Sequence, residues 1–387
     1  MNTIVVLLPG IAGTSLSHHD DILSTWPLKV ARTAVANEPE ALRMLEDPSL
    51  TPGEPIPWAL PITVFDLGYR GFRDYFEAAG FTSVLFSVNN PDLPAEPLQK
   101  LLVGFAYDWR QDNSGTAENL RTLLSRLHQL YGGGEYEVFL VGHSMGGLVS
   151  RAYLENPAYQ KDAWYGRVRA LITLGTPHLG APLAVAGING TITTEFLAPY
   201  NRLVQDFVNE SFSVSAYELL PPVQRKFIVG PEAYSIFDPA FRNTAAWAAL
   251  KEKGLDEAKI NRAGEFLAGL DYTGGGALPP YYCVYGLSTL FETCESFTYD
   301  AHGTLTEVDD MQGDAVVPKW SASFQGRAVE QIYSPPGGVN HLQLASNLDV
   351  LRTVAQWMGV TAPVVHFTGI EVPATAPAEA PAEAGVA

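Results

Sequence analysis

Short apolar runs alternate with amphipathic stretches along the chain, a pattern typical of a layered α/β domain. Residues 3–8 are β-branched or leucine side chains that end at a Pro-Gly pair, which predicts a buried strand and a tight turn. Residues 116–130 place leucines on one face of a helix that stops at a run of glycines. Residues 137–141, 145–154 and 169–174 then predict strand, helix and strand. This spacing favours a parallel βαβ unit.

Two long stretches interrupt this alternation. Residues 14–62 lack clean periodicity and are rich in proline, so we expect a lid-like excursion from the core, with one helical piece near 28–44. Residues 180–280 alternate helical pieces with proline-rich and glycine-rich breaks, which predicts a cap inserted in the core.

The C-terminal part returns to the core pattern. Residues 281–287 predict a strand of the sheet, two short strands are expected near 315–317 and 328–333, and a closing helix at 342–358. From 372 to 387 the chain consists of alanine, proline, glutamate, glycine, valine and threonine without a core-forming pattern. We expect this tail to be disordered.

One motif between a predicted strand and a predicted helix points to chemistry. Gly142, Ser144 and Gly146 form a Gly-x-Ser-x-Gly sequence. In such a turn the serine backbone is strained, and only minimal side chains fit two positions to either side. The serine Oγ is then exposed at a helix N-terminus, where N–H groups and the helix dipole favour a developing anion. We predict that Ser144 is a nucleophile; a glycine-rich turn without chemistry is the alternative.

This elbow sets the expected architecture. We predict an α/β-hydrolase fold over residues 1–365, with a mostly parallel central sheet, helices on both faces, and the inserted cap and lid. An oxyanion hole in this fold needs two backbone donors. One should be the N–H of Met145, and the other should come from the loop after the first strand, where Ile11 and Ala12 are candidates and Ala12 is slightly favoured.

The serine needs a general base, which follows serine and acid along the chain in this fold. His341 lies in a loop after a Pro-Pro-Gly-Gly sequence and just before the closing helix, where an imidazole can reach the site. His302 precedes the best acid candidate, and His366 lies beyond the closing helix. We predict His341 as the base; a helix-capping or surface histidine is the alternative.

An acid must orient that imidazole. Asp314 follows a glycine in a predicted tight turn, and it stands between Ser144 and His341 in the sequence. Asp309 and Asp310 are nearby competitors. We predict Asp314 as the acid; an aspartate that only forms the turn is the alternative.

The composition argues against some classes of binding partner. The 387 residues carry a formal net charge of −18, which argues against nucleic acid and against electrostatic docking on anionic lipid. An apolar rim can still make transient contact with a lipid surface. Apolar residues make up 47% of the chain, but no run is long enough to cross a membrane. The spacing of His18, His19, Asp20 and Asp21 fits no standard zinc site, so we expect no metal and no cofactor.

The N-terminal apolar run is short and lacks a basic region and a cleavage site, so we expect a strand and a cytoplasmic protein. Cys283 and Cys294 are then expected to be buried thiols; a disulfide between them is the alternative if the protein is exported.

Together these motifs resemble those of the lecithin:cholesterol acyltransferase-like family, which includes phospholipid acyltransferases and phospholipases. The matching pieces follow the family's order and span roughly residues 4 to 360. They are Leu8-Pro9-Gly10-Ile11, Tyr107-Asp108-Trp109-Arg110, Gly142-His143-Ser144-Met145-Gly146-Gly147, Leu174-Gly175-Thr176-Pro177-His178, Gly313-Asp314 with Val317-Pro318, and His341.

The resemblance implies Ser144, Asp314 and His341 as a catalytic triad, and a cap over an acyl pocket. It implies a serine-dependent hydrolase or O-acyltransferase that acts on lipid esters, with an acceptor alcohol in the transfer branch. Amidase, thioesterase or peptidase activity on the same fold is one alternative, and a non-catalytic lipid-binding module is another. For Asp108 and Arg110 we favour a structural ion pair near the pocket. Trp26 and Trp58 are candidates for lid contacts with lipid.

Overall fold

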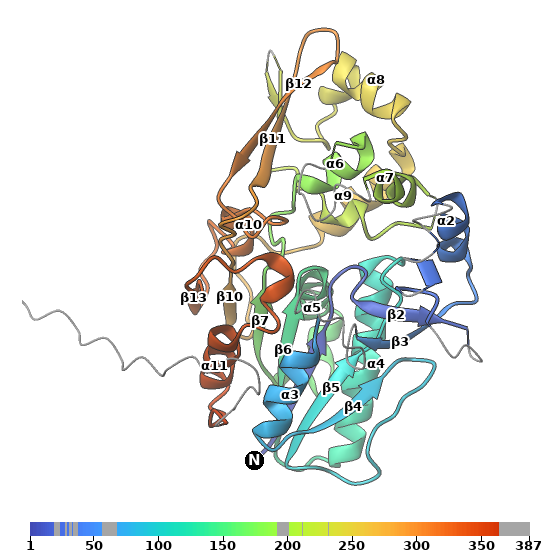
Figure 1. The fold of residues 1–387 in the computed structure, drawn as a ribbon. Coiled ribbons are helices and arrows are strands. Elements are labelled where there is room, and N and C mark those ends of the chain that lie inside the picture. Colours follow the sequence, from blue (N-terminus) through green and yellow to red (C-terminus); the bar gives the residue numbers. More distant parts are fainter. Residues whose placement is uncertain are drawn as a thin grey trace, which may run out of the picture.

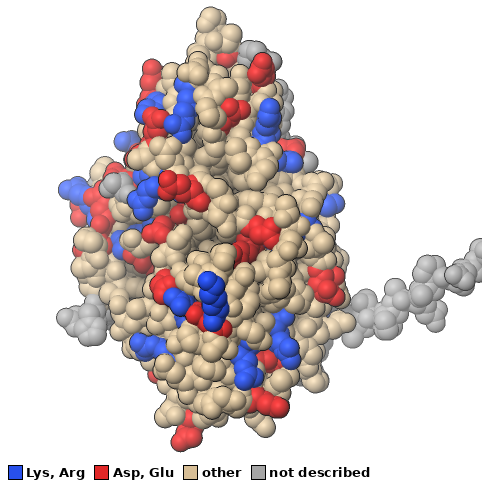
Figure 2. Space-filling view, turned by 180° about the vertical axis from the view of Figure 1, so that it is seen from behind, with Lys and Arg blue, Asp and Glu red and all other residues tan. Residues whose placement is uncertain are grey.

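The computed structural model describes residues 1–18, 24–27, 29–30, 33, 38–55, 68–191, 201–210, 212–230 and 232–363. The tail expected at 372–387 lies outside the described residues. Within the described part, no helix is both long and apolar enough to span a membrane. On the face shown in Figure 2, acidic and basic side chains are interspersed among uncharged residues.

The core is a seven-stranded sheet whose neighbouring strands all pair in parallel, in the order β13-β10-β7-β6-β1-β5-β4 (Figure 1). Its strands in chain order are β1 (Asn2–Leu8), β4 (Thr82–Phe86), β5 (Lys100–Phe105), β6 (Tyr136–His143), β7 (Val168–Leu174), β10 (Tyr281–Val284) and β13 (Gln331–Tyr333). The predicted α/β-hydrolase architecture is confirmed.

Helices cover both faces of this sheet (Figure 1). Helices α3 (Arg70–Ala78) and α11 (Leu348–Trp357) pack with Val5 and Leu7 of β1. Helices α4 (Asn113–Tyr131) and α5 (Met145–Leu154) pack with the alternate β1 residues, which face the other way. Because both faces of β1 are buried, its sequence is a continuous apolar run.

Local sequence signals set the ends of the longest helix, α4. The Asp112 side chain accepts a hydrogen bond from the Gly115 N–H at 2.8 Å, which caps its N-terminus. Gly132 ends it in the left-handed conformation, with φ of 58°. The predicted leucine face is buried against the sheet.

Two insertions form a cap above the sheet (Figure 1). Between β7 and β10 the chain forms α6 (Leu183–Asn189), α7 (Asn201–Asn209), β8 (Ile228–Val229), β9 (Ala233–Tyr234), α8 (Ala245–Glu252) and α9 (Glu257–Ala268). After β10 comes a hairpin of β11 (Thr293–Tyr299) and β12 (Leu305–Met311). The hairpin joins β8 and β9 in a second sheet, β12-β11-β8-β9, so the cap is built from two separate segments of the chain.

A third excursion follows β1. Strands β2 (Thr14–Ser17) and β3 (Thr51–Pro55) form a two-stranded antiparallel sheet, and α2 (Glu38–Glu46) lies between them in sequence. The helix expected at 28–44 overlaps α2, and most of its first half lies outside the described residues.

The prediction of a strand at 315–317 is wrong. Ala315 has φ of 77°, and the Asp314 Oδ1 accepts hydrogen bonds from the Val316 and Val317 N–H groups, so the segment is a turn. The short helix α10 (Lys319–Ala322) follows it. The strand expected at 328–333 is β13, and the closing helix begins later than predicted, after a 3-10 turn at His341–Gln343.

Candidate active site

Ser144 stands at the sharp turn between β6 and α5. Its backbone has φ of 52° and ψ of −125°, which is strained for a non-glycine residue. The surrounding glycines are needed for close packing. A Cβ on Gly142 would lie 2.5 Å from the Gly147 Cα, and one on Gly146 would collide with the Leu8 carbonyl. The motif therefore has the strained geometry that the sequence predicted for a nucleophile.

Asp314 and His341 meet beside this turn. The Asp314 Oδ2 lies 2.8 Å from the His341 Nδ1, and the His341 N–H donates to the Asp314 carbonyl oxygen at 2.8 Å. Gly175, at the end of β7, packs against both, because a Cβ there would lie 2.8 Å from the Asp314 Oδ2 and 3.0 Å from the His341 Nδ1. The neighbouring Leu174 carbonyl accepts the Ser144 N–H at 2.9 Å. The structure thus brings the three predicted residues to the carboxyl end of the sheet.

The three side chains are almost fully covered. Asp314 is 0% exposed, and Ser144 and His341 are each 5% exposed. In such an environment fixed hydrogen bonds and dipoles act more strongly than in water.

The loop after β1 approaches the nucleophile closely. A Cβ on Gly10 would lie 2.8 Å from the Ser144 Cβ. The Gly10 N–H donates to the Tyr69 hydroxyl at 2.9 Å, and the Gly13 N–H donates to the Gly10 carbonyl at 3.0 Å. With these two N–H groups taken, Ile11 and Ala12 remain the candidate oxyanion donors in the loop, beside Met145 at the start of α5. Ala12 is held at φ of 60°.

Aromatic side chains fix the carbonyl groups of the same loop. The Tyr107 hydroxyl donates to the Pro9 carbonyl at 2.5 Å, and the Trp109 Nε1 donates to the Thr14 carbonyl at 2.9 Å. The Trp26 Nε1 donates to the Ala12 carbonyl at 2.8 Å, and its ring packs edge-on against Trp109. Trp26 therefore has a structural role in the loop, while Trp58 lies outside the described residues.

Asp108 and Arg110 form the structural ion pair that we favoured. The Arg110 Nη2 lies 2.8 Å from the Asp108 Oδ2, and the guanidinium is almost fully buried. Arg110 Nη1 also donates to the carbonyls of Leu45 and Asp47, at 2.5 and 2.9 Å. The pair thus fastens the end of α2 to the segment that follows β5.

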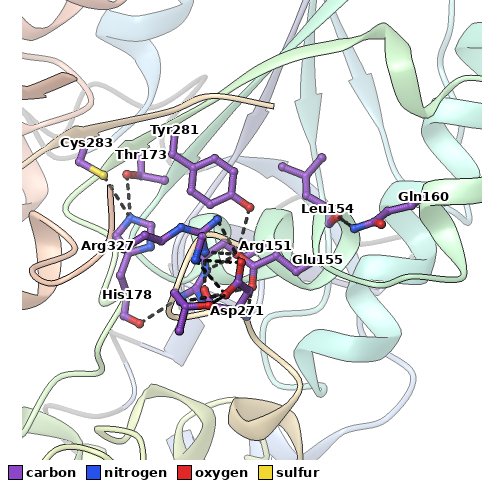
Figure 3. A network of polar contacts seen from close by, with 12 residues as sticks. Arg151, Leu154, Glu155, Gln160, Thr173, His178, Asp271, Tyr281, Cys283 and Arg327 are labelled. Carbon is purple, nitrogen blue, oxygen red and sulfur yellow. Dashed lines mark hydrogen bonds and ion pairs between the residues drawn. The ribbon is translucent and has the colours of Figure 1, made fainter. Parts of the chain in front are cut away.

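A second buried polar network lies at the far end of α5 (Figure 3). Glu155 accepts hydrogen bonds from Arg151, Arg327 and Tyr281, at 2.9, 3.1 and 3.0 Å to its Oε1. The Asp271 N–H donates to its Oε2 at 2.6 Å, and the Asp271 carbonyl accepts from both arginines. Since Asp271 follows α9, the network ties the returning cap chain to the helix that begins at the nucleophile.

His178 belongs to this network rather than to the catalytic group. Its Nε2 lies 3.0 Å from the Thr173 Oγ1, and its carbonyl accepts from Arg151 (Figure 3). Its ring stacks on Phe324. Burial, with the nearby guanidinium groups of Arg151 and Arg327, holds the pKa of His178 well below its usual range. A neutral, stacked imidazole here is a packing element.

Sequence reasoning missed most of this network. The sequence held one signal for it: Arg151 lies among apolar residues on a buried face of α5. A fully buried arginine requires an acidic or carbonyl partner, so this position predicts a polar network. Cys283 lies on β10 and Cys294 on β11, and both are buried thiols, as expected from the sequence. Burial raises the pKa of the Cys283 thiol to about 11.

The sheet order, the elbow and the cap define this chain as an α/β-hydrolase with a serine at the nucleophile position. A solved structure titled "The crystal structure of Tle4-Tli4 complex" shares the fold, with a TM-score of 0.56 and 16% identity, over 91% of this chain and 97% of that one. The family model described as lecithin:cholesterol acyltransferase matches residues 98–253, which include Ser144 but end before Asp314 and His341.

Named relatives agree with that match. The bovine (Bos taurus) lysosomal phospholipase A and acyltransferase is 29% identical over 51% of this chain and 46% of its own length. The Arabidopsis thaliana lecithin-cholesterol acyltransferase-like 4 is 33% identical over 68% of this chain and 56% of its own length. The chain thus spans about half the length of these relatives. These matches confirm its resemblance to the lecithin:cholesterol acyltransferase-like family.

Proposed function

We propose that this protein is a serine-dependent acyl hydrolase or O-acyltransferase that acts on lipid esters through an acyl-enzyme on Ser144. The observation that carries the proposal is the hydrogen-bonded Asp314–His341 pair beside a serine on a strained strand-to-helix turn. The family match supports lipid esters as the substrate class, because the relatives are named for phospholipase and acyltransferase activities.

In this proposal each group has a separate role. Asp314 holds the His341 Nδ1, so the other ring nitrogen, Nε2, takes the proton from Ser144 as its Oγ attacks the ester carbonyl. The N–H of Met145 and that of Ile11 or Ala12 stabilise the tetrahedral oxyanion. His341 then returns the proton to the leaving alcohol. Water or a second alcohol attacks the acyl-enzyme, with His341 as base again, and releases a fatty acid or a new ester.

Labelling with a fluorophosphonate probe tests the nucleophile. We expect wild-type protein to be labelled and Ser144→Ala to be unlabelled, with turnover reduced by several powers of ten. Ser83→Ala is the matched control, because this serine lies on β4, away from the site. Since Ser144 is 5% exposed, labelling should be repeated with mixed detergent–lipid micelles. Folded wild-type protein that stays unlabelled in both conditions would contradict the proposal.

A substrate panel tests the chemical class. Phosphatidylcholine vesicles without added alcohol should give fatty acid, and the same vesicles with a long-chain alcohol should also give a new ester if transfer competes with hydrolysis. Matched amide and thioester compounds belong in the same panel. Their preferential turnover would replace the lipid-ester assignment with one of the other acyl-transfer activities of this fold.

A further inference from the structure

A continuous chain of buried hydrogen bonds joins the parts of the candidate active site. The Gly10 N–H donates to the Tyr69 hydroxyl at 2.9 Å. The Tyr69 hydroxyl lies 2.8 Å from the His143 Nδ1, and the His143 Nε2 lies 3.0 Å from the His341 carbonyl oxygen. Tyr69 and His143 are 4% and 5% exposed, so these bonds are shielded from water.

Only one arrangement of protons satisfies this chain. Burial, with the facing His341, lowers the pKa of His143 to about 3, so its imidazole is neutral near pH 7. A carbonyl oxygen only accepts, so the single N–H of His143 is on Nε2 and its Nδ1 is an acceptor. The Tyr69 hydroxyl must therefore donate to Nδ1, and its oxygen accepts from Gly10.

The hydrogen-bond chain connects three parts of the candidate site. Gly10 begins the candidate oxyanion loop, and His143 directly precedes Ser144. The His341 main chain is held from two sides, since its carbonyl accepts from His143 and its N–H donates to the Asp314 carbonyl at 2.8 Å. Tyr69 stands at the start of α3, where no sequence motif marked it.

We propose that Tyr69 and His143 are positioning residues that hold the oxyanion loop, the nucleophile and the base at their working separations. This inference rests on the proposed function and deepens it. The loop after β1 packs tightly against these residues. A Cβ on Gly10 would lie 2.8 Å from the Ser144 Cβ, and one on Gly13 would lie 2.9 Å from the Tyr69 hydroxyl. Loss of the phenol oxygen frees the Gly10 N–H and the Nδ1 lone pair together.

Tyr69→Phe tests the proposal against a matched control on the same helix. Tyr75 is also buried on α3, but its hydroxyl has no hydrogen-bond partner in the described structure. We expect Tyr69→Phe to lower kcat on a soluble ester by about 10- to 100-fold with KM changed less than about twofold, because small misplacements of reacting groups are costly. Tyr75→Phe should leave both constants near the wild-type values. Equal kcat for the two variants would overturn the proposal.

A second pair of variants covers the case in which Tyr69→Phe fails to fold. In His143→Gln the side-chain amide can still donate to the His341 carbonyl, whereas His143→Leu cannot. We expect the glutamine variant to keep at least about 10-fold more kcat than the leucine variant at similar thermal stability. Equal kcat in the two variants would contradict the positioning role.

Fluorophosphonate labelling separates the two hypotheses. Wild-type protein that is labelled at Ser144, with Tyr69→Phe labelled equally fast, would overturn the positioning role and leave the proposed function standing. Wild-type protein that is neither labelled nor active on any ester would overturn both.

Discussion

The two carboxylate oxygens of Asp314 have different partners: one contacts His341, and the other accepts hydrogen bonds within the turn that carries Asp314. Oδ2 lies 2.8 Å from the His341 Nδ1, while Oδ1 accepts the N–H groups of Val316 and Val317 at 3.1 and 2.7 Å. Because backbone N–H groups hold Oδ1 in place, the carboxylate cannot rotate and Oδ2 stays directed at His341. In the proposed mechanism, Asp314 therefore sets both the tautomer and the orientation of the His341 imidazole.

We expect Asp314→Asn to lower kcat by about 10⁴-fold, since an amide of the same shape can stabilise the wrong tautomer of His341. Steady-state ester hydrolysis measures the effect, and circular dichroism checks that the fold is kept. Asp349→Asn is the control, because this aspartate is exposed at the start of α11. A loss below about tenfold would show that another group orients the imidazole.

Single residues also show which features of the candidate site the sequence can predict and which it cannot. Ser144, Asp314 and His341 were predicted from short motifs, because the elbow glycines, the turn and the loop before a helix are local features. Tyr69 was not predicted, because its role comes only from contacts with Gly10 and His143. Such contacts between distant segments leave no local pattern.

At the scale of elements, helix α5 joins two polar centres. Its first turn lies at the nucleophile, and Arg151 and Glu155 at its other end form the buried network with Arg327 (Figure 3). Removal of one partner from such a network leaves an unpaired buried charge, which costs more than the pair contributes.

We expect Arg151→Met to lower the free energy of unfolding by about 3–5 kcal/mol, because Glu155 and the carbonyls of His178 and Asp271 lose a donor. Urea denaturation measures the change. Arg121→Met is the matched control, since its ion pair with Asp162 is partly exposed, and a loss of about 1 kcal/mol or less is expected there. Similar losses of unfolding free energy in both variants would show that the buried network stabilises the protein no more than a surface ion pair does.

Among the elements, strands β1, β6, β7 and β10 and helix α4 could be predicted because each has an apolar pattern of its own. The hairpin β11–β12 could not, since its burial depends on pairing with β8 far away in the sequence. The wrong prediction of a strand at 315–317 has a similar cause, because hydrogen bonds, rather than the apolar pattern, decide the structure of this segment. Its residues are apolar, but the Asp314 side chain accepts hydrogen bonds from the N–H groups of Val316 and Val317, which impose a turn.

At the scale of the whole molecule, cap and core meet at a buried carboxyl group. Glu218 is 2% exposed, and its Oε2 accepts the N–H of Asn113 at the start of α4, at 2.7 Å. Burial raises the pKa of Glu218 to about 8; the nearby Asp112 also raises this pKa, while the Asn113 hydrogen bonds and Arg262 oppose the shift. The folded protein therefore keeps this proton over a range where the unfolded chain loses it.

This difference makes stability depend on pH. The stabilising contribution of protonated Glu218 is complete below pH 4.5 and is lost as pH rises to about 8, because the unfolded chain releases its proton first. We expect Glu218→Gln to reduce the fall in unfolding free energy between pH 5 and 8 by about 2–4 kcal/mol, measured by urea denaturation. Glu265→Gln, on the exposed face of α9, should leave the fall unchanged. An unaltered slope in Glu218→Gln would show that the carboxyl is ionised.

The second cap insertion ends close to Asp314, the proposed catalytic acid. Strand β12 stops at Met311, Gly313 bridges to Pro318 across the turn, and Asp314 follows directly. Only Gln312 and Gly313 separate the hairpin from Asp314, so the hairpin and this turn are directly connected. A substitution that displaces the hairpin is therefore expected to displace the Asp314 carboxylate as well.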